Sequence, residues 1–250
     1  MFKSKSLLSI NADAKTSKGE TFGFLTGIMY LAPYKSTEWN TCSMAQIAEC
    51  GTACLFSAGR GAMSTVAQGR INKTVWFFTE RTTFMQQLVV NIRQLVKKAA
   101  KQSLIPLVRL NGTSDIRWET VGFTDVDGTE YVNIFAAFPD IQFYDYTKIP
   151  SRNLVGKTSG NYDLTYSFSA ITPKPISIKG LTNPNNSRVA VVFQKQADIP
   201  TSFRSWPVVD GDDSDVRHIE PKNVVVALYA KGKAKREDNG FVQIKGIHYA

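Results

Sequence analysis

The chain has 250 residues, of which 43% are hydrophobic and 20% are charged. This composition is typical of a folded globular protein and argues against long disordered segments. The length suits a single domain over residues 1–250. Lys and Arg outnumber Asp and Glu by 30 to 21, and the resulting net charge of +9 favours encounter with anions such as phosphates.

No apolar run reaches the roughly 18 residues that span a bilayer, and the apolar character of the start is lost after Ile10. The sequence therefore predicts neither a membrane partner nor secretion. All three cysteines lie within thirteen positions and cannot all pair with one another. A reducing compartment such as the cytoplasm is expected, with the thiols used for metal or redox chemistry.

The first predicted strand occupies the second half of residues 22–33 and stops at Pro33. A loop that holds the cysteines follows, and then two helices over residues 61–80 and 82–100. In the second helix, apolar residues recur at spacings of three and four, which predicts one buried face. These residues are Phe84, Leu88, Ile92, Leu95 and Ala99.

Five short runs rich in β-formers come next, with residues 206–213 as a sixth candidate. The five runs are residues 105–112, 141–148, 162–170, 188–194 and 223–232. Their separations suit crossover connections, so we predict an α/β fold with a mostly parallel sheet, forming an irregular or partial TIM-like barrel. The cysteine loop would follow its first strand. The prolines between Ala170 and Arg188 predict a loop there, and an antiparallel sheet with one wet face is the alternative.

Polar residues interrupt two of the predicted strands. Arg109 and Asn111 share one face of the first run, and Asp145 lies in the next. Because α/β proteins bind ligands at the carboxyl ends of their strands, we predict that these three residues line a polar lumen and bind a cofactor or substrate. The alternative is a buried hydrogen-bond network that fixes the strand register.

Cys42, Cys50 and Cys54 have the spacing C-x7-C-x3-C. Thiolates prefer soft metals, so three of them suit an iron–sulfur cluster or zinc. Structural zinc needs four protein ligands, and the two histidines, His218 and His248, are remote in sequence. A [4Fe–4S] cluster can be held by three cysteines, which leaves one iron open. We therefore predict such a cluster, with zinc or three packed thiols as the alternatives.

Two functions are compatible with this prediction. The first is redox, Lewis-acid or radical-type chemistry at the open iron, with a small-molecule substrate or an electron donor as the partner. The second is a module, stabilised by zinc or a cluster, that binds nucleic acid through the net charge of +9. No P-loop, nucleophile elbow or dinucleotide-binding glycine pattern is present, which argues against kinase and hydrolase functions.

Long motifs throughout the chain resemble the gene product 88 family of tailed-phage proteins. They are NADAKTSKGE, TGIMYLAP, NTCSMAQIAECGTACLFSAGRG, RLNGTSDIRWE, FYDYTK, NYDLTYSFS, VAVVF, VVDGDDSDVR and ALYAKGKAK. The resemblance covers nearly the whole chain, although Glu49 stands where the family usually has a glycine before the second cysteine. It implies a phage origin and the cytoplasm of the infected bacterial host.

The placement of the cysteine loop is also similar to that in radical S-adenosylmethionine enzymes, which hold a [4Fe–4S] cluster by three cysteines after the first barrel strand. This similarity implies S-adenosylmethionine as a candidate cofactor. The spacing differs from the C-x3-C-x2-C of that superfamily, and Ala53 stands where an aromatic residue precedes the last cysteine. A Gly-Gly-Glu segment is also absent.

Overall fold

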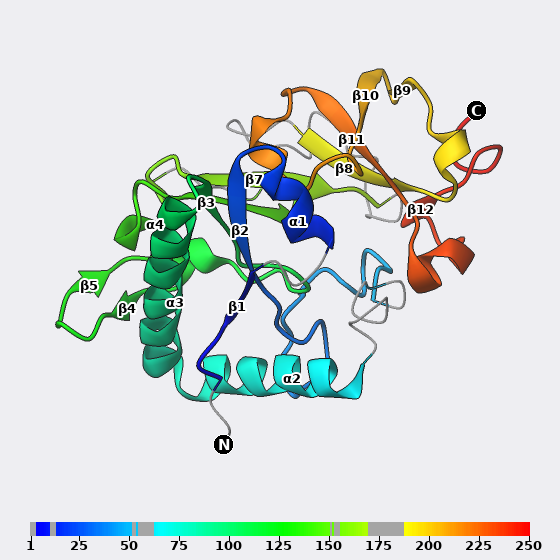
Figure 1. Ribbon diagram of the computed structural model, residues 1–250. Coiled ribbons are helices and arrows are strands. Elements are labelled where there is room, and N and C mark those ends of the chain that lie inside the picture. The colour runs from blue at the N-terminus through cyan, green and yellow to red at the C-terminus, as the bar shows by residue number, and fades with distance from the viewer. Residues whose placement is uncertain are drawn as a thin grey trace.

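The computed structural model describes residues 4–10, 14–51, 54, 63–150, 152, 156–169 and 188–250. The described elements form a mixed α/β fold around one large sheet (Figure 1). The helices are α1 (Ala14–Glu20), α2 (Ser64–Thr79), α3 (Arg81–Lys101) and α4 (Ile134–Ala137). Short 3-10 turns include η3 (Trp118–Thr120), η5 (Arg217–Ile219) and η6 (Gly232–Arg236).

The strands fall into the large sheet and a separate hairpin. The large sheet contains β1 (Leu8–Ile10), β2 (Phe24–Met29), β3 (Ile105–Arg109), β6 (Gln142–Thr147), β7 (Tyr162–Ser167), β8 (Arg188–Phe193), β9 (Ser202–Phe203), β10 (Trp206–Asp210), β11 (Val224–Tyr229) and β12 (Val242–Gln243). The hairpin consists of β4 (Phe123–Thr124) and β5 (Glu130–Tyr131) and projects beside α3 (Figure 1).

The strand order of the large sheet is β1-β2-β3-β6-β7-β8-β11-β10-β9, with β12 paired to β8. All neighbours from β2 to β10 pair in parallel, whereas β1 and β9 add antiparallel at the two ends. The predicted mostly parallel α/β sheet is therefore confirmed. Among the described strands β1 and β9 do not pair with each other, so no closed barrel forms and the TIM-like part of the prediction is not confirmed.

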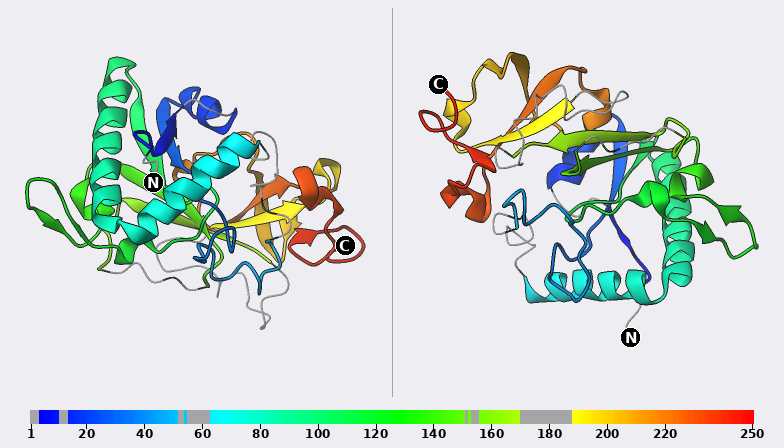
Figure 2. Two further views of the ribbon diagram at one scale, coloured as in Figure 1. Left: turned by 90° about the horizontal axis from the view of Figure 1, so that it is seen from below. Right: turned by 180° about the vertical axis from the view of Figure 1, so that it is seen from behind.

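The main core lies between α2, α3 and one face of the sheet. Leu88 and Ile92 of α3 are fully buried against Leu25 of β2 and Val108 of β3. The apolar period predicted for residues 82–100 therefore marks the buried face of α3. Figures 1 and 2 show α3 beside the N-terminal strands and β9 to β12 at the other end of the sheet.

The opposite face of the sheet is covered by α1 and by the segment that joins β10 to β11. Gly19 of α1 lies against Thr26 of β2, and its absent Cβ would be 3.2 Å from Thr26 Oγ1. Val216 of the joining segment packs on Leu107 and Tyr144. The connection from β10 to β11 thus reaches back across the sheet as far as β3 and β6.

The predicted strands after residue 104 match β3, β6, β7, β8 and β11, and the sixth candidate matches β10. The predicted loop between Ala170 and Arg188 lies almost wholly in residues 170–187, which are outside the described residues. Within the part that is described, none of the helices combines the length and apolar character needed to cross a membrane.

Gly69 lies inside α2 with open space around it, because a Cβ at this position would meet nothing within 4 Å. Glycine in a helix interior is less favourable than alanine by roughly 0.5–1 kcal/mol. Gly69→Ala is therefore expected to raise the free energy of unfolding by about that amount in urea denaturation.

Gly112 offers the matched control. A Cβ there would lie 2.6 Å from Tyr30 Cδ1 and 2.7 Å from the carbonyl oxygen of Met29. Gly112→Ala should lower the free energy of unfolding by about 1–3 kcal/mol, because a backbone atom must shift to make room. Equal effects of the two substitutions would contradict this account of the packing.

Candidate functional site

A pocket of about 230 Å³ lies where the parallel strands end. Its walls come from the segment after β2, the ends of β3, β6, β7 and β11 with the residues that follow them, the interior of β8, and the C-terminal turn η6. The described lining residues are Pro33, Tyr34, Cys42, Met44, Ala45, Cys50, Gly51, Cys54, Arg109, Asn111, Gly112, Thr113, Ser114, Asp115, Tyr146, Thr147, Lys148, Ser167, Val192, Asp212, Leu228, Tyr229, Lys231, Ala234 and Phe241.

This location follows from the topology. Parallel strands direct their carboxyl ends to one edge, where the turns that leave them surround a crevice. The volume lies just below the roughly 300–1,000 Å³ of sites for drug-sized ligands. The pocket therefore suits a smaller molecule.

Cys42, Cys50 and Cys54 all line this pocket. Their individual surroundings differ. Cys42 Sγ lies 3.8 Å from the carbonyl oxygen of Thr113, and Cys50 Sγ lies 3.9 Å from that of Ala45. Burial raises the pKa of Cys42 to about 11 and also raises the pKa of Cys50, so both are neutral thiols at pH 7.

The described part of the chain contains no group of three or more His, Cys, Asp or Glu residues arranged to hold a metal ion. The predicted function as a [4Fe–4S] protein with three cysteine ligands and an open iron is therefore wrong. The same finding gives no support to the zinc or cluster of the alternative module, whose binding to nucleic acid stays a prediction. Lining one cavity does not bring three sulfur atoms to the ~2.3 Å at which they would bind one ion.

The histidines do not supply a ligand at the pocket. His218 packs its ring on Phe24, with the centroids 5.3 Å apart, on the face covered by the β10–β11 segment. His248 Nδ1 accepts a hydrogen bond of 3.0 Å from the backbone of Ile244. Neither lines the pocket in the described part of the chain.

Arg109 reaches the pocket from the end of β3. Its Nη1 donates a 2.8 Å hydrogen bond to Asp215, and its guanidinium lies 4.9 Å from the centre of the Tyr146 ring. Burial acts to lower the pKa of Arg109, but Asp215 together with the neighbouring tyrosines holds the pKa above the ordinary value. Arg109 Nε and Tyr146 Oη are buried and have no hydrogen-bond partner among the described residues.

Asn111 lines the pocket, whereas Asp145 lies beneath it. The backbone N–H of Asn111 donates to Asp145 Oδ1 at 2.7 Å, and Tyr162 Oη donates to Asp145 Oδ2 at 3.0 Å. Burial raises the pKa of Asp145 to about 7, against the lowering effect of Arg109. The structure thus places Asp145 where it supports the loop after β3, and its predicted role as a cofactor ligand stays a prediction.

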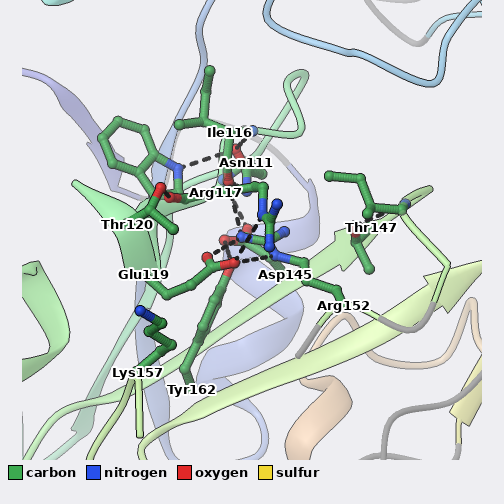
Figure 3. A network of polar contacts seen from close by, with 12 residues as sticks. Asn111, Ile116, Arg117, Glu119, Thr120, Asp145, Thr147, Arg152, Lys157 and Tyr162 are labelled. Atoms are coloured by element: carbon green, nitrogen blue, oxygen red, sulfur yellow. Dashed lines mark hydrogen bonds and ion pairs between the residues drawn. The ribbon is translucent and has the colours of Figure 1, made fainter. Parts of the chain in front are cut away.

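A buried ionic network fixes that loop from the other side (Figure 3). Arg152 Nε donates to Glu119 at 2.7 Å, and a second guanidinium nitrogen pairs with the other oxygen of the same carboxylate. Its Nη1 lies 3.3 Å from Asp115. Sequence reasoning missed Glu119 and Arg152 as partners because they are 33 residues apart and follow no period.

Lys148 follows β6 and also lines the pocket. Its ammonium donates a 2.8 Å hydrogen bond to the carbonyl oxygen of Phe168 and lies 4.2 Å from the centre of the Phe241 ring. Burial lowers the pKa of Lys148 to about 8, although Cys50 and Asp115 oppose this effect. Among the described residues Lys148 forms no ion pair.

A family model described as gene product 88 matches residues 3–245. The chain belongs to the gene product 88 family. The resemblance in its motifs is therefore confirmed, and with it membership of a phage gene-product family. No curated protein and no solved structure matches this family member.

Arg152 can be tested by removing its charge. Arg152→Met leaves Glu119 and Asp115 buried without their cation, and breaking a buried pair in this way costs about 3–5 kcal/mol. The free energy of unfolding should fall by that amount in chemical denaturation. Lys231→Met is the control, because the side chains of Lys231 and its partner Asp212 are 42% and 16% exposed, and this pair should contribute about 1 kcal/mol or less.

The raised pKa of Asp145 predicts that the free energy of unfolding depends on pH. Its pKa rises from an ordinary 3.8 to about 7 on folding, so the folded protein binds more protons than the unfolded chain between these values. The contribution of Asp145 to stability is therefore fully present below the unfolded pKa and is lost as the pH rises through about 7. Asp145→Asn removes this loss.

Urea denaturation of both proteins at about pH 4 and about pH 8 provides the measurement. The stability of Asp145→Asn relative to the native chain should increase from the lower to the higher pH. Glu220, whose pKa is also raised to about 7 by burial, is present in both proteins and cancels in the difference. If the difference in free energy of unfolding between the two proteins is the same at both pH values, the raised pKa of Asp145 is contradicted.

Proposed function

We propose that this member of the gene product 88 family binds a small anionic molecule in the pocket at the carboxyl ends of its parallel strands. The observation that carries this proposal is the state of Lys148, a cation that lines the pocket and has no ion-pair partner among the described residues. A partly buried ammonium group is stabilised by an anion that it can bind directly.

Lys148 differs from the other cations at the site. The other cations at the site have carboxylate partners: Arg109 pairs with Asp215 and Lys231 pairs with Asp212.

The approach to the pocket also favours an anion. Lys231 and Ala234 of the 231–236 segment line the pocket, and Lys233, Lys235 and Arg236 of the same segment are exposed. With the net charge of +9, these residues raise the local concentration of small anions. The apolar and aromatic lining, including Tyr34 and Phe241, would cover the remainder of a small organic molecule.

Calorimetric titration of the purified chain with acetate, pyruvate, phosphate and their uncharged analogues tests the proposal. At least one anion should bind more tightly than its uncharged analogue. Lys148→Met should weaken that binding by about tenfold or more, since a charged hydrogen bond is worth about 1.5–3 kcal/mol.

Lys233→Met is the matched control, because it removes the same charge from an exposed position that does not line the pocket. It should leave the affinity within about twofold of the native value. Binding that is equally strong for charged and uncharged compounds, or equal losses in the two variants, would overturn the proposal.

A further inference from the structure

The hairpin of β4 and β5 exposes apolar side chains at one end of the molecule. Val126 is 71% exposed and Val132 is 73% exposed, the two highest values among the large hydrophobic residues of the described chain. The hairpin projects beside α3 in the views of Figures 1 and 2. Apolar side chains that gather on one projecting element are typical of a protein interaction site.

Hydrogen bonds and an ion pair hold the hairpin in a fixed conformation. The buried carboxylate of Asp125 pairs with Arg93 at 3.0 Å and accepts a hydrogen bond of 2.8 Å from the backbone N–H of Val126. The backbone N–H of Asp125 donates to the carbonyl oxygen of Thr129 at 2.9 Å. Because the turn is ordered before a partner arrives, docking on it costs little conformational entropy.

The residues around the hairpin carry only negative charge. Residues 118–147 contain six Asp and Glu residues and neither Lys nor Arg, although the whole chain has a net charge of +9. Three of the six acidic residues are exposed, namely Asp127, Glu130 and Asp140. The hairpin therefore combines apolar and acidic side chains on a basic protein.

The opposite end of the sheet carries a complementary surface. In the 231–236 segment four of the six residues are basic and none is acidic, and Lys233, Lys235 and Arg236 are exposed. Ile247, which follows β12, is 70% exposed. Figures 1 and 2 show η6 and the residues after β12 at the end of the sheet far from the hairpin. The two surfaces therefore cannot meet within one copy, but they can meet between two copies.

We propose that the chain associates head to tail with a second copy of itself, with the β4–β5 hairpin of one copy docked on the 231–236 segment and Ile247 of the next. Asp127 and Glu130 face the exposed basic side chains, and the two valines leave water against Ile247. Because the two surfaces differ, the interface is heterologous and further copies can add in the same way. Charge complementarity of exposed groups makes such an association sensitive to salt.

Analytical ultracentrifugation of the full chain over a range of concentrations tests the inference. Species larger than the monomer should form at about 50 mM NaCl and should be weakened by about tenfold or more at about 500 mM. The hairpin variant, Asp127→Lys with Glu130→Lys, should weaken self-association by about tenfold or more at the lower salt concentration. The segment variant, Lys233→Glu with Lys235→Glu, should have the same effect. All four residues are exposed, and circular dichroism establishes that each variant is folded.

An equal mixture of the two variants is the matched control. The basic hairpin of one variant then faces the acidic segment of the other, so mixing should restore the larger species. The four substitutions combined in one chain should restore them as well, because both surfaces are reversed and the net charge equals that of the native chain. Neither result can come from a variant that has lost its fold.

Three outcomes would overturn the proposal. The first is a chain that stays monomeric at low salt over the whole range of concentrations. The second is association that both variants leave unchanged, because it would use another surface. The third is loss of association in each variant without recovery on mixing. If the native chain stays monomeric and binds a DNA duplex that the segment variant does not bind, the 231–236 segment is a nucleic-acid surface and the self-association is wrong.

Discussion

Parallel pairing of the strands is the constraint on which the rest of this structure depends. From β2 to β10 each strand runs in the same direction as its neighbours in the sheet, so their carboxyl ends meet at one edge. Each parallel connection must return to the opposite edge before the next strand begins, and α2 with α3 makes that return between β2 and β3. The cysteine segment, the loop after β3 and Lys148 are therefore neighbours although they are far apart in the chain.

Charge compensation decides how the residues at this edge behave. The carboxylates of Glu119 and Asp215 are almost wholly buried, and each is matched by an arginine. Because an uncompensated buried charge is costly, these pairs hold the loops around the pocket in fixed positions. Lys148 is the contrast among the described residues, as its hydrogen-bond acceptor is a neutral carbonyl group. Within the described part of the chain, Lys148 thus lines the pocket without the carboxylate partner that Arg109 and Lys231 have.

The cysteines illustrate the limit of spacing as evidence. All three line the pocket, but among the described residues they form no group that could hold a metal ion. The spacing did not determine where each sulfur points, and the thiols of Cys42 and Cys50 lie near different backbone carbonyl groups. Register has a similar effect on Arg109 and Asp145. Val108 is paired with Phe143, so Arg109 and Asp145 fall on opposite faces of the sheet, and among the described residues Arg109 lines the pocket whereas Asp145 does not.

The sequence by itself determined the elements whose signal is local: the apolar period of α3 and the strands β3, β6, β7, β8 and β11. It also determined the family, through motifs spread over the chain. Only the tertiary structure decided the pairing of Arg152 with Glu119, the pairing of Arg109 with Asp215 across 106 residues, and the hydrogen bond of Lys148 to a neutral carbonyl group. The physical reason is that a hydrophobic period depends only on residues within one helix or strand. The partner of a buried charge depends on which loops the sheet brings together.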